Sequence, residues 1–149
     1  MLTSKRNSPY QISQVAWQEA AAALTEVRRK VFIEEQSVPE ALEWDGLDDR
    51  AIHFLATDAA QNPIGCARLL AGGKIGRMAV MSAWRHQGVG RALLEAVIAE
   101  CRRHGLAQAM LSAQTHAIAF YQTSGFVVCS DIYDDAGIPH RDMALTLTP

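Results

Sequence analysis

The sequence lacks the features that mark secreted, membrane-spanning and metal-binding proteins. Its 149 residues include only three cysteines (Cys66, Cys101 and Cys129), and no two of them form a C-x-x-C pair. Because three cysteines cannot all pair, a disulfide framework and a zinc knuckle are disfavoured and a reducing compartment is favoured. The five histidines show no H-x-x-x-H spacing, so no metal is expected. No apolar run approaches the roughly 18 residues of a membrane span, and residues 1–10 lack the apolar stretch of a signal peptide. We therefore expect a cytoplasmic protein without a membrane partner.

The chain also lacks a strong net charge, but its charges are unevenly placed. The formal net charge of −2 argues against a large nucleic-acid footprint. Seven carboxylates and no Lys or Arg lie in residues 31–49: Glu34, Glu35, Glu40, Glu43, Asp45, Asp48 and Asp49. Seven basic residues lie in residues 68–103: Arg68, Lys74, Arg77, Arg85, Arg91, Arg102 and Arg103. The first segment would attract a cation and the second an anion, unless both are solvated faces of opposite sign.

The length and the 49% apolar content predict one domain, because a chain of this size buries about two thirds of its unfolded surface. We expect a flexible polar segment over residues 1–9 and one domain over residues 10–149. Hydrophobic periodicity predicts helices over residues 17–32, 89–104 and 116–124, and strands over 11–15, 52–58, 64–71, 74–80, 107–113, 126–130 and 143–148. Gly72-Gly73 predicts a hairpin, Thr115 is the expected cap of the third helix, and the cysteines are expected in the core. This order predicts an α/β fold with a mixed, mostly antiparallel sheet and helices on both faces.

The stretch most informative about function runs from a strand through a glycine loop into a helix. Gly88 and Gly90 let the backbone approach a ligand closely, and the first amides of the following helix have no partners within it. The helix dipole makes that end positive, and Arg85 and Arg91 add full charges, so the sequence predicts an anion site whose usual occupant is phosphate. The spacing matches neither a three-glycine dinucleotide loop nor a P-loop. From these residues alone, glycines that serve only a turn are the open alternative.

The arrangement of these residues resembles the acetyl-coenzyme A signature of the GCN5-related N-acetyltransferases, the GNAT superfamily. Arg85-x-x-Gly88-x-Gly90 follows the strand residues Arg77-Met78-Ala79-Val80, and a second landmark, Phe120-Tyr121-x-x-x-Gly125-Phe126, stands at the family's distance. The resemblance covers residues 27–147. Finer features are similar to the small bacterial ElaA-type branch: Val31-Phe32-Ile33-Glu34-Glu35-Gln36, Asp45-x-x-Asp48, His53, Ala113-Gln114 and Gly137-Ile138-Pro139-His140. The resemblance implies a single-domain GNAT fold whose central strands splay apart.

The resemblance implies acetyl-coenzyme A as co-substrate and assigns roles by position. The backbone of Met78, Ala79 and Val80 would pair with pantetheine. The amides of residues 86–91 would hold the pyrophosphate, with Arg85 near it; these residues are His86, Gln87, Gly88, Val89, Gly90 and Arg91. Tyr121 would stand beside the sulfur and protonate the departing thiolate as general acid, and Gln114 stands where the family often has Asn.

The family's chemistry is direct attack by an amine in a ternary complex, with no metal. The Val80 amide would polarise the thioester carbonyl, and a base must take the amine's proton. The candidate bases are Glu34, Glu35 and His140, followed by His53 and His116. Each has a plainer reading: Tyr121 as a core aromatic, the histidines as satisfied strand or loop residues, and the two glutamates as solvated side chains at a helix end.

We therefore expect an N-acetyltransferase that moves an acetyl group from acetyl-coenzyme A to a primary amine, either a small cationic amine, a polyamine or a lysine-like group. The acidic segment, together with Asp131, Asp134 and Asp135, would attract such a cation. Two other classes stay open: a non-catalytic coenzyme A-binding regulatory module, and a partner-binding protein whose acidic segment docks on a basic surface. No nucleic-acid partner is expected. Many relatives form homodimers, and the sequence does not decide whether this chain does.

Overall fold

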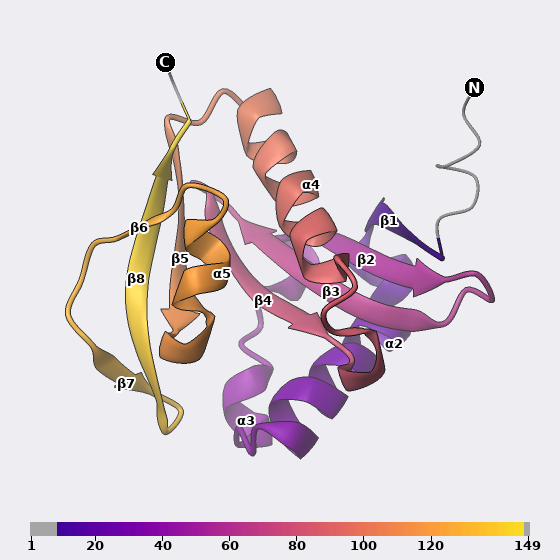
Figure 1. Cartoon of the computed structure of the whole chain (residues 1–149). Coiled ribbons are helices and arrows are strands. Elements are labelled where there is room, and N and C mark those ends of the chain that lie inside the picture. Colours follow the sequence, from indigo (N-terminus) through magenta and orange to yellow (C-terminus); the bar gives the residue numbers. More distant parts are fainter. Residues whose placement is uncertain (1–8, 148–149) are drawn as a thin grey trace.

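The computed structural model describes residues 9–147, and one sheet of eight strands organises them. The strand order is β1 (Tyr10–Val15), β2 (Ile52–Asp58), β3 (Pro63–Leu70), β4 (Lys74–Val80), β5 (Gln108–Gln114), β8 (Ile138–Thr146) and β6 (Val127–Val128), and β7 (Tyr133–Asp135) also pairs with β8 (Figure 1). Every pairing is antiparallel except that of β4 with β5. The expected mixed, mostly antiparallel sheet is therefore confirmed.

Helices cover both faces of this sheet, as the sequence predicts. The helical elements are α2 (Trp17–Arg28), a π-helix (Arg29–Glu35), α3 (Glu40–Glu43), α4 (Val89–Arg103), α5 (Ile118–Gln122) and 3-10 turns at Asp48–Arg50, Ser82–Trp84 and Thr115–Ala117. Helices α4 and α5 pack on one face and α2 on the other, so the core has two parts (Figure 1). Strand β2 contributes side chains to both parts of the core, because Phe54 points to the α4 side and Leu55 to the α2 side. No helix within residues 9–147 is long and apolar enough to cross a membrane.

The sheet opens between β4 and β5. These two strands pair only at Lys74 with Met110 and at Ile75 with Leu111, although both continue for several residues. Strand β4 has a bulge against β3 just beyond this point, where Arg77 takes a φ of +49°. A bulge bends its strand and ends regular pairing. The splayed central strands implied by the resemblance are thus present, and they leave a V-shaped gap.

Several local predictions are wrong, mostly about where a helix or strand begins or ends. The first helix is regular only to Arg28 and continues as a π-helix. Thr115 caps nothing, because neither the 3-10 turn nor α5 has a side-chain cap. The last strand begins at Ile138 rather than 143, β7 was not predicted, and Cys129 is exposed rather than in the core. The expected flexible segment, apart from Pro9, and Thr148 lie outside the described residues.

Candidate active site

A cavity of about 900 Å³ lies in the gap between the splayed strands β4 and β5. Its lining brings together most of the predicted site residues: Met78, Ala79, Val80, Arg85, His86, Gly88, Gly90, Arg91, Gln114, Tyr121, His140 and Glu35. This volume is at the upper end of what small-molecule and cofactor sites occupy. Residues far apart in the sequence therefore share one cleft, and three predicted residues, Glu34, Gln87 and Val89, are not part of its lining.

The N-terminus of α4 opens onto this cleft. Gly88 precedes the helix with a φ of +89°, the left-handed region that glycine enters without steric cost. A Cβ at Gly90 would lie in ordinary van der Waals contact with the ring of Phe120, 3.4 Å from its Cζ. The Val89 side chain is buried in the core and that of Gln87 donates to the Ala83 carbonyl. Any contact those two residues make with a ligand would come from their backbone.

The end of β4 forms the opposite edge of the cleft. The amide of Met81 donates to the Ile64 carbonyl on β3 over 2.8 Å. Because backbone groups alternate along a strand, those of Val80 face the other way, towards the gap. The carbonyl oxygen of Val80 accepts a 3.0 Å hydrogen bond from Nε of Arg85. The Val80 amide therefore faces the gap rather than β3.

Tyr121 lies in an apolar part of the cleft. Its ring packs edge-on against Phe120 and Phe126, with centroids 5.1 and 6.0 Å away. Its hydroxyl has a weak 3.8 Å contact to Sδ of Met78. Burial raises the pKa of Tyr121 to about 12. The phenol therefore keeps its proton at neutral pH, which suits a proton donor.

His140 lines the same cleft from β8. Its Nδ1 lies 2.7 Å from the Ile138 carbonyl, and since a carbonyl can only accept, Nδ1 carries the proton in the neutral ring. That leaves Nε2 with a lone pair. The ring stacks on Tyr133, whose hydroxyl donates to Asp142 over 2.5 Å and contacts Ser112 over 2.7 Å. His140 therefore has a fixed orientation and an available basic nitrogen.

Three of the other candidate bases, Glu35, Glu34 and His53, fit less well. The carboxylate of Glu35 accepts two hydrogen bonds from Arg85, of 2.5 and 2.7 Å, which lower the pKa of Glu35 and make it a poor base. Glu34 is exposed outside the lining of the cleft. His53 is buried elsewhere, with Nε2 2.8 Å from the Asp48 carbonyl, and burial lowers its pKa. His116 does line the cleft.

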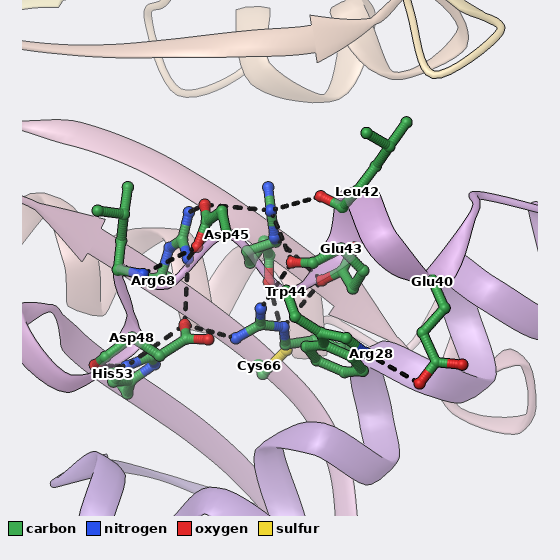
Figure 2. A network of polar contacts seen from close by, with 12 residues as sticks. Arg28, Glu40, Leu42, Glu43, Trp44, Asp45, Asp48, His53, Cys66 and Arg68 are labelled. Carbon is green, nitrogen blue, oxygen red and sulfur yellow. Dashed lines mark hydrogen bonds and ion pairs between the residues drawn. The ribbon is translucent and has the colours of Figure 1, made fainter.

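The acidic segment does not form the open negative surface that we expected. Arg28 donates to Glu43 over 2.9 Å and to Asp48 over 2.7 Å (Figure 2). Arg68 donates to Asp45 over 2.8 Å and to Asp48 over 3.1 Å (Figure 2). Arg77 reaches Glu43 and Asp45, so these carboxylates are neutralised within the molecule. With Glu35 paired to Arg85 and Glu40 to Arg29, five of the seven carboxylates are engaged by arginine.

Burial and pairing oppose each other in this network. Burial works against the ionisation of Asp48, but the hydrogen bonds and charges of Arg28 and Arg68 prevail and lower its pKa. The pKa of Asp45 is lowered for the same reason, with Arg68 as its main partner. Burial raises the pKa of Glu43 despite its arginine partners. The network ties the acidic segment to α2, β3 and β4 and so shapes one end of the cleft.

Sequence reasoning missed several residues that matter here. Arg28 is 1% exposed although it carries a charge, and its partners follow 15 and 20 residues later. Tyr133 was likewise not singled out. Gln36 was named only within the ElaA-type motif and given no role, although it accepts a 2.8 Å hydrogen bond from Gln114 across the cleft. The one available signal for Arg28 was its place beside Val27 on the buried side of the first helix.

The family assignment agrees with this geometry. The family model described as the acetyltransferase (GNAT) domain matches residues 14–147. The chain therefore belongs to the GNAT family of acetyltransferases.

Individual relatives agree in sequence and in fold. The uncharacterized N-acetyltransferase YjcF of Bacillus subtilis (strain 168) is 36% identical over 121 residues, which are 78% of this chain and 86% of that protein. Protein ElaA of Escherichia coli (strain K12) is 32% identical over 130 residues, 82% of this chain and 84% of ElaA. The crystal structure of Escherichia coli ElaA has a TM-score of 0.81 at 28% identity, covering 91% of this chain and 99% of that chain. That of PaiA N-acetyltransferase from Thermoplasma acidophilum, in complex with coenzyme A, has a TM-score of 0.73 at 17% identity, covering 94% and 100%.

Proposed function

We propose that this protein transfers an acetyl group from acetyl-coenzyme A to a primary amine, by direct attack within a ternary complex. The observation that carries the proposal is the convergence, in one cleft, of the splayed end of β4, the glycine-flanked start of α4 and the protonated phenol of Tyr121. Membership of the GNAT family and the coenzyme A complex of the PaiA structure support it.

The cleft offers the groups that acetyl-coenzyme A needs. The backbone of Met78 and Val80 would pair with the pantetheine arm, which β4 can do because it has left β5. Ala79, which the resemblance places with them, pairs with Cys66 on β3, so its backbone groups turn away from the gap. The unpaired amides at the start of α4 would receive the pyrophosphate, aided by the helix dipole and by Arg91. Gln114 lines the facing wall. Bound there, acetyl-coenzyme A supplies an activated thioester carbonyl.

Two groups of the chain would handle the charge and the proton that arise on the coenzyme side. The Val80 amide faces the gap and would stabilise negative charge on the carbonyl oxygen. Tyr121 would hold its proton at the hydroxyl until the thiolate departs, since burial keeps the phenol neutral.

On the acceptor side, His140 is the base that the geometry favours, because its Nδ1 is occupied and its Nε2 is free to take a proton from the amine. A covalent acetyl-cysteine route has no support. Within residues 9–147, no cysteine lines the cleft, and burial raises the pKa of Cys66 to about 12.

The acceptor is proposed to be a small cationic amine, a polyamine or a lysine-like group. With most of the acidic segment neutralised, the attraction comes from the hairpin of β7 and β8, where Asp135, like His140, lines the cleft. Asp131 and Asp134 are exposed on the same stretch. Among the described residues, no Lys or Arg forms an ion pair with these three carboxylates. We place the protein in the cytoplasm, which the three free cysteines support.

The proposal is tested by incubating the protein with acetyl-coenzyme A and a panel of amines while thiol release is recorded. The panel contains a diamine, a polyamine, a lysine-containing peptide and an acidic amino acid as the control for charge. We expect thiol release with the cationic amines and little with the acidic control. Binding of acetyl-coenzyme A without turnover of any amine would instead indicate a non-catalytic coenzyme A-binding module.

A further inference from the structure

Two consecutive residues that line the cleft, Glu35 and Gln36, have no part in the proposed chemistry. Glu35 ends the π-helix and Gln36 follows it. Glu35 holds Arg85 through two hydrogen bonds, and Arg85 in turn donates to the Val80 carbonyl over 3.0 Å. Gln36 accepts a 2.8 Å hydrogen bond from Nε2 of Gln114, the last residue of β5. One residue thus reaches the β4 side and the next reaches the β5 side.

Both residues stand at the C-terminal end of the π-helix. The amide of Gln36 donates to the Val31 carbonyl five residues earlier, so the last turn is wider than an α-turn. The two strands no longer hold each other at this level, because their pairing ended at Ile75 and Leu111. Beyond that point, among the described strands, β4 is held only by β3 and β5 only by β8, so the contacts of Glu35 and Gln36 are links from one further element to both strand ends.

The ion pair between Glu35 and Arg85 is too exposed to contribute much to the stability of the fold. The side chains of Glu35 and Arg85 are 44% and 33% exposed. Ion pairs as open as this one add little to the free energy of unfolding. The paired, two-point geometry instead fixes direction, which a forked guanidinium and a carboxylate do well.

We infer that Glu35 and Gln36 form a brace across the cleft, in which Glu35 positions Val80 through Arg85 and Gln36 positions Gln114. The inference rests on the proposed function, since it assigns both strand ends to acetyl-coenzyme A. Neither brace residue needs to touch the reacting atoms. Both act as positioning residues that preorganise the two walls, and preorganisation of a site raises its affinity.

The test is the dissociation constant of acetyl-coenzyme A, measured by titration calorimetry, which requires no knowledge of the acceptor. Glu35→Ala and Gln36→Leu are each expected to weaken binding about tenfold. Gln36→Glu, which keeps an acceptor oxygen for Gln114, is expected to bind as the wild type does, and Glu35→Gln to fall between. Glu40→Ala is the matched control, because it breaks an exposed pair with Arg29 on the same segment outside the cleft. Melting temperatures of all variants are expected to lie near that of the wild type.

Double variants separate positioning from direct contact. If Glu35 acts only through Arg85, Glu35→Ala has no further effect in the Arg85→Ala background, and Gln36→Leu has none in the Gln114→Leu background. Full additivity in both pairs, or Glu35→Ala and Gln36→Leu binding as tightly as Glu40→Ala, overturns the brace. A wild-type chain that binds no acetyl-coenzyme A overturns the proposed function and the brace together. A chain that binds but acetylates no amine overturns only the proposed catalysis.

Discussion

The surroundings of Tyr121 determine the protonation state of its hydroxyl. Phenylalanines flank its ring, and its hydroxyl has only a weak sulfur contact. An apolar site of this kind disfavours the phenolate, so the pKa rises and the proton stays on the oxygen. His140 shows the complementary case, in which one hydrogen bond to a backbone carbonyl selects the tautomer. A phenol that keeps its proton and an imidazole whose Nδ1 is occupied thereby line the same cleft.

Replacing Tyr121 with Phe should separate rate from binding. The substitution keeps the ring and removes only the hydroxyl, so kcat is expected to fall about a hundredfold. The dissociation constant of acetyl-coenzyme A should stay close to that of the wild type. Because the pKa of Tyr121 is about 12, the phenol keeps its proton up to pH 10. Loss of this proton should therefore cause no decrease in wild-type kcat between pH 8 and 10. Equal turnover in Tyr121→Phe would remove the hydroxyl from the mechanism.

The start of α4 is the element that the proposed phosphate site depends on. Its backbone conformation is made by Gly88, whose φ of +89° would strain any residue with a side chain. A Cβ there would also lie 3.2 Å from the Tyr10 hydroxyl. The other end of the helix offers a matched case, since Gly105 has a φ of +69° and open space around it.

Gly88→Ala and Gly105→Ala should therefore both lower stability, but only the first should lower binding. Each places a side chain in a left-handed conformation, which costs about 1–2 kcal/mol of unfolding free energy. Only Gly88→Ala should weaken acetyl-coenzyme A binding, because only that end of the helix faces the cleft. Urea unfolding measures the free energy of unfolding, and titration calorimetry measures the dissociation constant of acetyl-coenzyme A. Unchanged binding in Gly88→Ala would argue against a phosphate site at this helix end.

Elements with a clear local pattern could be predicted from the sequence, and those made by distant partners could not. The apolar runs 52–58 and 74–80 match β2 and β4 at both ends, and the helix stripe containing Leu93, Leu94 and Val97 is buried as expected. Strand β7 was missed because its three residues are exposed and polar. The π-helix was missed because its wider turn has no separate hydrophobic period. Within the site, the motif residues were found, whereas the pairing of Glu35 with Arg85, fifty residues later, leaves no local signal.

At the scale of the whole molecule, folding brings acidic and basic residues that are separated in the sequence into ion pairs. Three carboxylates of the acidic segment, Glu43, Asp45 and Asp48, form one largely buried network with the arginines of α2, β3 and β4 (Figure 2). Asp48 is its centre, because it accepts from both Arg28 and Arg68. Removing one member of a buried network leaves charged partners without compensation, which is more harmful than removing an exposed pair.

Asp48→Ala should accordingly lower the free energy of unfolding by about 3–5 kcal/mol at pH 7, and the near-isosteric Asp48→Asn by less. The pKa of Asp48 is lowered in the folded state, so its contribution is complete above about pH 4 and is lost as the pH falls further. The difference between the wild type and Asp48→Asn should therefore shrink from pH 7 to pH 3. Urea unfolding at both pH values measures it. A difference that grows on acidification would contradict the network as described.

The central claim is that the cleft between β4 and β5 binds acetyl-coenzyme A, and thermal unfolding with and without an excess of this ligand tests it most directly. A ligand at a hundred times its dissociation constant stabilises the folded state by about 2.7 kcal/mol, which for a domain of this size raises the melting temperature by about 5–10 °C. The account predicts such a rise with acetyl-coenzyme A and none with NADH or ATP at the same concentration. No rise at saturating acetyl-coenzyme A would contradict it.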